Sequence, residues 1–314
     1  MKFSREQTQR LILVSIGLVQ GFIFWVTYEF WPEDPQIEAL LAALISFVSV
    51  RGLIYQFAWT GRDKVRQFVV GGILSAFFAL VTLWVWWQRP GEGALFQGDS
   101  FRLPTLAVAS LLSLYILLPF IQIFQESGRP IFPYSELFCH SWNNFFIAAI
   151  GFLFAGLFWG LISLWVALFN LVGISFFEDV FYSAPFVSIS LPAMFGFGIA
   201  LGKENGAIIN TLRRITLAIF RSLLPLLAFV GLLFLAALPF TGLQPLWDTK
   251  SASPLLLSVL LLTMLFINSV FQDGTGPRPY PDWVRRGVEG LLLVMPFFQD
   301  SLSMPSVYGL PNMV

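Results

Sequence analysis

Two arginines lie inside stretches of sequence that are otherwise apolar and long enough to cross a lipid bilayer. Arg51 is followed by the polar Gln56, whereas Arg221 lies about two turns into its apolar stretch. A charged side chain at the centre of a span costs about 2.5 to 3.5 kcal/mol on insertion scales, so each is a functional hypothesis by default. Either arginine is suited to contact an anionic substrate or lipid head group. Snorkelling of the side chain, or packing between helices, is the alternative for both.

Arg221 shares one predicted helical face with Asn210 and Arg214. Offsets of 4 and 11 residues return to nearly the same side of a helix that turns about 100° per residue. Such a stripe is suited to bind a carboxylate, a phosphate or the head group of an anionic lipid. Anchoring to lipid is the simpler of these interpretations.

The most polar segment next to a span is PYSELFCHSWNN, residues 133–144. If it is helical, Glu136, His140 and Asn144 stack at intervals of four residues. Histidine titrates near neutral pH, so this stack predicts a proton relay at the inner mouth of a transporter. An interfacial helix with its polar face toward the cytoplasm is the alternative.

A second segment, ISFFEDVFYSAPF, places Glu178 and Asp179 among several phenylalanines. This pattern is typical of an amphipathic helix that lies in the membrane interface, here on the outer side. A gate, or a lip that attracts cations, is the functional alternative.

Composition excludes several classes of protein. Hydrophobic residues make up 57% of the 314 residues and charged residues only 11%, whereas a soluble domain has about 25% charged residues. The net charge of +0 offers no basic field to nucleic acid. With one histidine and one cysteine, the chain cannot build a closed Cys/His zinc site or a bis-histidine haem site. We therefore expect no metal, no cofactor and no nucleic-acid partner, and nothing in the sequence indicates an enzyme.

The apolar stretches define the elements that must position these residues. A helix needs about 20 apolar residues to cross a hydrocarbon core of about 30 Å. Eight stretches qualify, and a shorter ninth covers residues 287–301. The eight run approximately over residues 11–31, 37–59, 68–88, 103–124, 145–170, 185–202, 215–240 and 254–271. The sequence thus predicts an all-α, polytopic transmembrane helix bundle of about eight or nine spans, in one membrane domain over residues 1–314.

The distribution of positive charge predicts the orientation of the bundle. Basic connections stay on the cytoplasmic side of a membrane. With the N-terminus inside, 13 of the 18 Lys and Arg residues fall in inner segments, three in outer segments, and two are the intramembrane arginines. This alternation predicts a cytoplasmic N-terminus.

Four segments carry a resemblance to a known family. They are PYSELFCHSWNNFF (133–146), GLFWGLISLWVALFNLVGISFFEDVF (156–181), LPFTGLQPLW (238–247), and INSVFQDG with PYPDWVRR (267–286). On these motifs the chain resembles, over nearly its whole length, the multi-pass family named "domain of unknown function 4153". The resemblance implies a bacterial inner (cytoplasmic) membrane, but no catalytic residues. Family members continue beyond a motif similar to Tyr308 and Gly309. The resemblance therefore also implies that this chain is either the N-terminal part of a longer protein or a departure from the family's pattern.

Taken together, these features favour a transporter or lipid-handling protein for an anionic or amphipathic substrate. A non-catalytic scaffold or sensor subunit is the alternative, in which the outer phenylalanine-rich segment and glycine pairs at four-residue spacing would dock partners. Those pairs are Gly156 with Gly160 and Gly198 with Gly202. An intramembrane transferase for lipid-linked substrates is a third hypothesis. The expected partners are membrane lipids, a second copy of the chain or another membrane protein.

Overall fold

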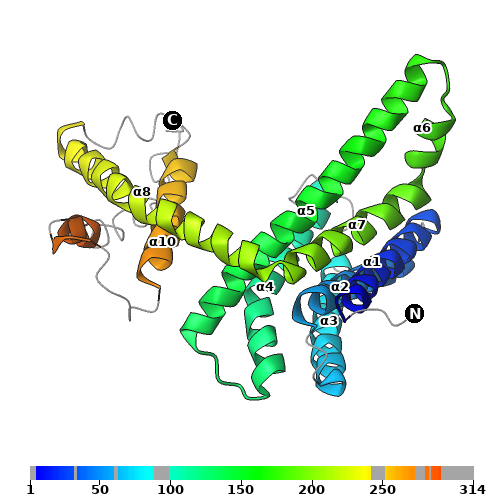
Figure 1. Cartoon of the computed structure of the whole chain (residues 1–314), viewed down its shortest axis with the longest axis horizontal. Helices are drawn as coiled ribbons and strands as arrows, with labels where there is room; N and C mark the ends of the chain where they lie inside the picture. Colours follow the sequence, from blue (N-terminus) through cyan, green and yellow to red (C-terminus); the bar gives the residue numbers. More distant parts are fainter. Residues whose placement is uncertain are drawn as a thin grey trace, which may run out of the picture. The chain divides into compact units, whose positions relative to one another are not determined.

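The computed structural model describes residues 5–31, 34–59, 63–87, 99–241, 252–272, 280–282 and 284–290. Every regular element in these residues is an α-helix (Figure 1). Seven of the described helices are long and apolar enough to cross a membrane, and a shorter apolar stretch, Leu257–Phe271, belongs to an eighth. The prediction of an all-α, polytopic helix bundle is confirmed, and the protein is a multi-pass membrane protein.

Apart from the short α6, the helices coincide with the predicted spans and extend beyond most of them. They are α1 (Arg5–Glu29), α2 (Pro35–Ala58), α3 (Lys64–Trp87), α4 (Asp99–Ser127), α5 (Tyr134–Leu171), α6 (Phe176–Phe181), α7 (Ala184–Glu204), α8 (Gly206–Thr241) and α10 (Ala252–Phe271). The largest extension is at α5, because the polar segment before the predicted span continues the same helix. The ninth predicted stretch, 287–301, lies mostly outside the described residues.

The described chain divides into two compact units, and each has its own hydrophobic core. The first unit, Met1–Thr211, contains α1 to α7 and the first residues of α8, and the second covers Leu212–Val314. The core of the first unit includes Leu13 of α1, Ile54 of α2 and Ile199 of α7, all almost fully buried. In the second unit, Leu224 of α8 packs with Phe266 of α10.

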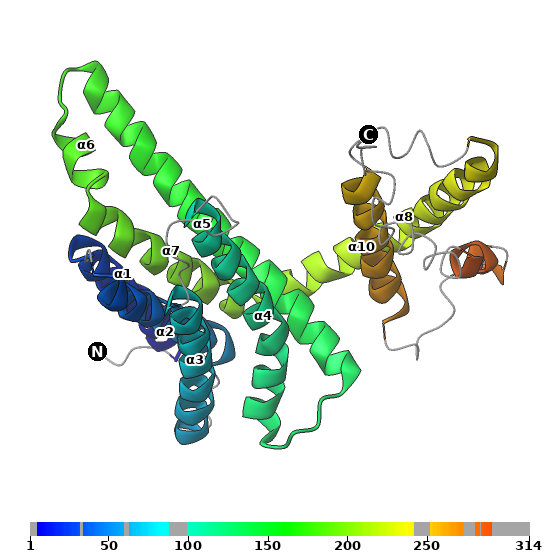
Figure 2. The ribbon, with the colours of Figure 1, turned by 180° about the vertical axis from the view of Figure 1, so that it is seen from behind.

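Glycines allow α1 and α7 to pack most extensively in the first unit, and the two helices lie side by side in Figure 2. A Cβ atom built on Gly17 would lie 2.3 Å from the carbonyl oxygen of Pro192. One built on Gly21 would lie 2.4 Å from the carbonyl oxygen of Ser188. Small residues that let backbones touch are a common basis of helix association in lipid. The backbones of α1 and α7 are therefore in direct contact.

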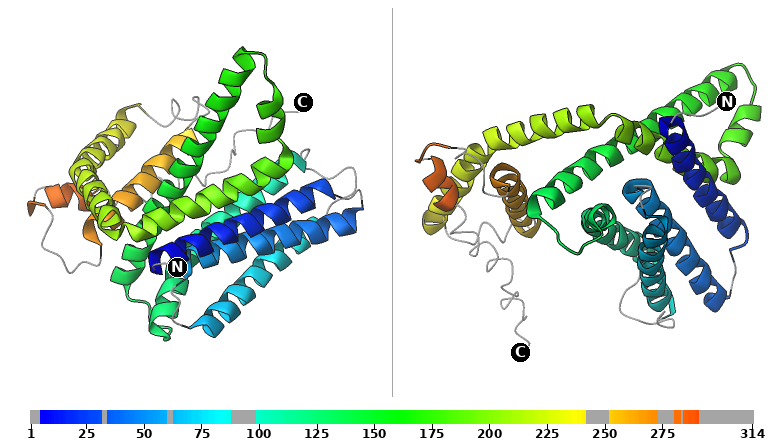
Figure 3. Two further views of the ribbon diagram at one scale, coloured as in Figure 1. Left: turned by 45° about the vertical axis from the view of Figure 1, so that its right-hand side comes forward. Right: turned by 60° about the horizontal axis from the view of Figure 1, so that its bottom comes forward.

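Capping residues fix where several helices begin and end. Asp34 accepts a hydrogen bond of 2.8 Å from the backbone N–H of Gln36, and Pro35 occupies the first turn of α2. Gly128 and Gly173 follow α4 and α5 with φ angles of 72° and 79°. Glycine adopts this left-handed conformation without steric cost, which suits the end of a helix. The helices α1 and α2 also contact each other and lie side by side in Figure 3.

Candidate functional site

Arg51 reaches from α2 toward α3. Its Nη1 donates a hydrogen bond of 2.8 Å to the backbone oxygen of Phe68, and its Nη2 donates one of 3.1 Å to the hydroxyl of Tyr55. The guanidinium carbon lies 4.6 Å from the ring centres of both aromatic residues. Gly71 leaves the room for this arrangement, because a Cβ there would lie 2.5 Å from Nη1. Two rings and two hydrogen bonds therefore hold the charge in one position.

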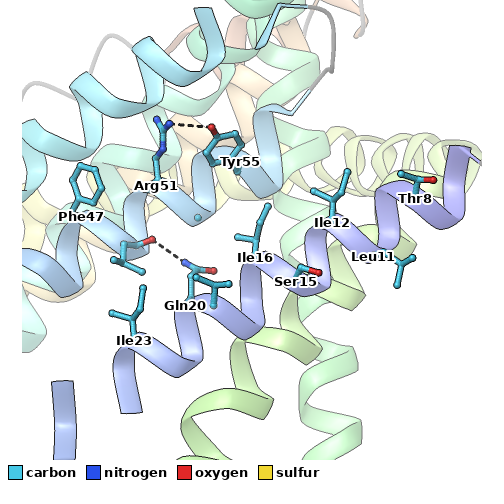
Figure 4. A pocket seen from close by; sticks show the side chains of 13 residues that line it. Thr8, Leu11, Ile12, Ser15, Ile16, Gln20, Ile23, Phe47, Arg51 and Tyr55 are labelled. Atoms are coloured by element: carbon cyan, nitrogen blue, oxygen red, sulfur yellow. Dashed lines mark hydrogen bonds between the residues drawn. The ribbon is translucent and has the colours of Figure 1, made fainter. Parts of the chain in front are cut away.

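A groove of about 530 Å³ runs between α1 and α2 beside Arg51 (Figure 4). Its wall is mostly apolar and includes Leu11, Val19 and Phe47. Figure 4 shows Thr8 and Ile23 at opposite ends of the α1 side, with Arg51 rising from α2 between them. The groove thus combines a long apolar wall with one fixed positive charge at its rim.

The charge of Arg51 is not balanced by a carboxylate within the part of the chain that the structure describes. An arginine side chain carries five N–H donors, and the two hydrogen bonds above use two of them. Intramembrane charges are almost always paired or face a polar cavity. The position therefore has N–H donors that the described residues leave unused.

A second groove, of about 410 Å³, lies between α2, α3 and α4. The hydroxyls of Ser49 and Thr82 in its wall donate to carbonyl oxygens of their own helices, at 2.7 and 2.9 Å. The wall also contains Ser46 and Ser110, and its other residues are apolar.

The predicted stripe of Asn210, Arg214 and Arg221 lies on one continuous helix, α8, and all three side chains are exposed. The hydroxyl of Tyr280 donates a hydrogen bond of 2.6 Å to the backbone oxygen of Arg221. Burial raises the pKa of Tyr280 above its ordinary value, and the positive charge of Arg221 offsets part of this rise. The role of the stripe toward anionic groups stays a prediction.

The three residues of the predicted proton relay lie on one helix, α5, and have different surroundings. Glu136 lies exposed in the first turn of α5, and the nearest acidic partner of His140 is Glu126 of α4, with 3.9 Å between Nε2 and Oε2. Asn144 is buried and pairs with Gln122 of α4 through two hydrogen bonds of 2.9 Å. His140 and Asn144 thus face α4. The role of the three residues in proton transfer stays a prediction.

The segment predicted as an outer interfacial helix contains α6, which is six residues long, and its place in the outer interface stays a prediction. Glu178 and Asp179 are exposed, and Glu178 accepts a hydrogen bond of 2.7 Å from the side chain of Asn170. Phe177 packs between Trp165 and Phe169 of α5, with ring centres 5.6 and 4.4 Å away. Aromatic contacts therefore attach α6 to the end of α5.

Sequence reasoning missed a set of donors that meet at the end of α2. The last four carbonyl groups of a helix have no partner within the helix. Three of these groups in α2 each accept a hydrogen bond from a side chain of a different helix. They are Gln56 from Lys203 of α7, Phe57 from Gln122 of α4 and Ala58 from Gln67 of α3, at 2.6, 3.1 and 2.9 Å. Amides within apolar stretches were the available signal, but the sequence analysis singled out neither Gln67 nor Gln122.

Charge also joins the ends of α1 and α7. Arg10 forms a bidentate ion pair with Glu204, in which Nε donates to Oε1 at 3.1 Å. The ammonium of the neighbouring Lys203 points instead at the end of α2, where a positive charge is favoured by the helix dipole. Polar groups therefore gather at this end of the first unit, while the grooves are apolar.

Comparison of the chain with protein-family models, with curated proteins and with solved structures finds no match.

Proposed function

We propose that the protein handles lipids by binding an anionic amphiphile in the groove between α1 and α2. The observation that carries this proposal is the intramembrane charge of Arg51, which stands at the rim of an apolar groove without an acidic partner among the described residues. An acidic lipid supplies a head group for the arginine and a chain for the groove.

The dimensions of the groove suit such a ligand. It follows α1 from Thr8 to Ile23, about 22 Å at a rise of 1.5 Å per residue. One leaflet contributes about half of a hydrocarbon core of about 30 Å. The groove therefore has room for one chain and for the part of the head group that contacts Arg51. With the N-terminus in the cytoplasm, this head group belongs to the inner leaflet.

The lining favours a lipid over a water-soluble solute. A small polar solute needs several converging polar groups, whereas the described grooves present mainly hydrocarbon. Gln20, the main amide in the first groove, already donates to the carbonyl oxygen of Val48 at 3.2 Å. The ligand's specificity would come from a single acidic group that meets Arg51.

A scaffold role is the second candidate, because one face of α5 has no neighbour in the described chain. A Cβ built on Gly156 or Gly160 would meet no described atom within 4 Å, whereas one on Gly198 would lie 2.7 Å from Gly151. The open pair would then receive a partner helix.

We also propose that the chain belongs to the family named "domain of unknown function 4153" and that it lies in the bacterial inner membrane. The sequence motifs support the first of these proposals, and the motifs and the charge bias support the second.

The lipid proposal is tested by native mass spectrometry of Arg51→Gln. In detergent with an equal mixture of phosphatidylglycerol and phosphatidylcholine, we expect the wild-type protein to retain phosphatidylglycerol. Hydrogen bonds to charged groups contribute about 1.5 to 3 kcal/mol, so the variant should bind about 10- to 100-fold more weakly. Arg51→Lys should fall between the two, because lysine keeps the charge but lacks the planar fork.

Two controls separate ligand binding from helix packing. Arg129→Gln removes the same charge from an exposed turn and should leave lipid binding unchanged. Tyr55→Phe removes a partner of Arg51 but keeps the charge, so it should also retain the lipid. Equal retention of both lipids by the wild type, or unchanged binding by a folded Arg51→Gln protein, contradicts the proposal.

A further inference from the structure

A separate group of buried polar atoms lies between α3 and α4. The side chains of Gln67 and Gln125 are each only 1% exposed. Neither the Nε2 nor the Oε1 atom of Gln125 has a hydrogen-bond partner among the described residues, and the same holds for Oε1 of Gln67 and Nε of Arg66. Buried polar groups in proteins nearly always have a partner, in the protein or in ordered water.

The contacts of these residues place them at one location. Gln67 donates through its amide nitrogen to the carbonyl oxygen of Ala58 at 2.9 Å. Gln122 lies about one turn before Gln125 on α4, and it donates to the carbonyl oxygen of Phe57, the residue before Ala58. Arg66 Nη2 donates to the backbone oxygen of Gln125 at 2.8 Å. The residues that carry the unpartnered atoms therefore lie near the end of α2, on the α3 and α4 sides.

We propose that this location is a binding site for ordered water. A water molecule donates and accepts hydrogen bonds at once, and buried waters typically bind two to four polar groups. The site offers both kinds, because Gln125 Nε2 and Arg66 Nε donate while the two Oε1 atoms accept. α3 and α4 make few contacts with each other, so water completes an interface that side chains leave incomplete.

The chemistry of the site favours water over an ion. The guanidinium of Arg66 repels a cation. Its charge is already opposed by Asp63, whose Oδ2 lies 3.8 Å from Arg66 Nε, which reduces the attraction for an anion. The remaining groups are neutral amides that offer donors and acceptors together, which is the pattern that water satisfies.

The sign of a stability change distinguishes a hydrated amide from a dry one. Methionine has nearly the shape of glutamine but no hydrogen-bonding amide. In Gln125→Met, loss of the amide leaves the bound water and Gln67 with fewer partners, so we expect the thermal midpoint of the purified protein to fall by about 2 to 4 °C. If the amide were dry, its removal would relieve an unsatisfied group, and the midpoint would rise or stay unchanged. Gln122→Met is the control, because the amide of Gln122 is hydrogen-bonded to protein groups rather than to water. The thermal midpoint of this variant should fall.

Cysteine labelling tests the same site without relying on stability. In a Cys139→Ser background, Gln125→Cys should react with a small water-soluble thiol reagent about tenfold faster than Leu118→Cys, which lies on the same helix within the hydrophobic core. A midpoint that rises or stays unchanged in Gln125→Met, or labelling at residue 125 no faster than at residue 118, would overturn the proposal.

Discussion

Replacing Gly17 with alanine should destabilise the protein by about 3 kcal/mol or more, the upper end of the usual cost of overpacking. The new Cβ would lie 2.3 Å from the carbonyl oxygen of Pro192 and 2.8 Å from the Cα of Ala193. Both contacts are with backbone atoms, so no rotation of a side chain relieves them. The helices α1 and α7 must separate, and with them the core residues that they bury together.

The measurement is the unfolding midpoint in detergent, with the monodisperse fraction from size-exclusion chromatography. Gly156→Ala is the matched control, because it makes the same chemical change on α5 where no described atom lies within 4 Å. Alanine is favoured over glycine in a helix by up to about 1 kcal/mol, so this variant should be unchanged or slightly more stable. Equal midpoints for the two variants would show that α1 and α7 do not touch at Gly17.

Asn144→Leu should cost about 1 to 3 kcal/mol, because it leaves the buried amide of Gln122 without its partner. The two amides exchange two hydrogen bonds of 2.9 Å, and both side chains are buried. Replacing both residues, in Gln122→Leu with Asn144→Leu, removes both buried polar side chains together. The double variant should therefore recover most of the loss, apart from the bond that Gln122 gives to Phe57.

A double-mutant cycle of unfolding free energies in detergent measures this coupling. Residues that share a hydrogen bond typically show an interaction energy of about 0.5 to 3 kcal/mol. Glu126→Gln provides a comparison on the same two helices, since it alters the longer contact with His140 in a more exposed setting. That variant should change stability by less than about 1 kcal/mol. Additive losses at residues 122 and 144 would contradict the pairing.

The positions of the helices were largely predictable from sequence, since the length of an apolar run decides whether it crosses a bilayer. Each of the eight predicted spans corresponds to one described helix. The boundaries were less predictable, because a polar segment such as residues 134–144 continues α5 without a break. Hydropathy does not distinguish a helix that ends at the interface from one that continues beyond it.

The contacts between helices were not predictable, because they depend on how each helix is rotated about its axis. Asn144 stacks with His140 and Glu136 by spacing, but it pairs with Gln122 across the bundle. Of the two glycine pairs that spacing singled out, Gly156 and Gly160 meet no described neighbour, whereas Gly198 and Gly202 pack against α5. The contact of Gly17 with α7 was not predicted. Small residues at four-residue spacing occur on many membrane helices, so spacing alone does not identify the packed pair.

Arg51 illustrates what sequence and structure each contribute. Its charge within an apolar stretch marked it as a candidate site, and the structure shows that Tyr55 and Phe68 hold its guanidinium. Such contacts serve packing between α2 and α3, and in the proposed function they would also fix the direction from which a ligand's acidic group approaches. Preorganised donors bind an anion without the cost of ordering a long side chain.

An experimental structure of the protein in nanodiscs that contain phosphatidylglycerol tests the central claim most directly. The account predicts one bound lipid whose phosphate lies within hydrogen-bonding distance of the Arg51 guanidinium and whose chain follows the groove from Leu11 to Ile23. A groove that is empty, or that holds a chain whose head group lies away from Arg51, would contradict it.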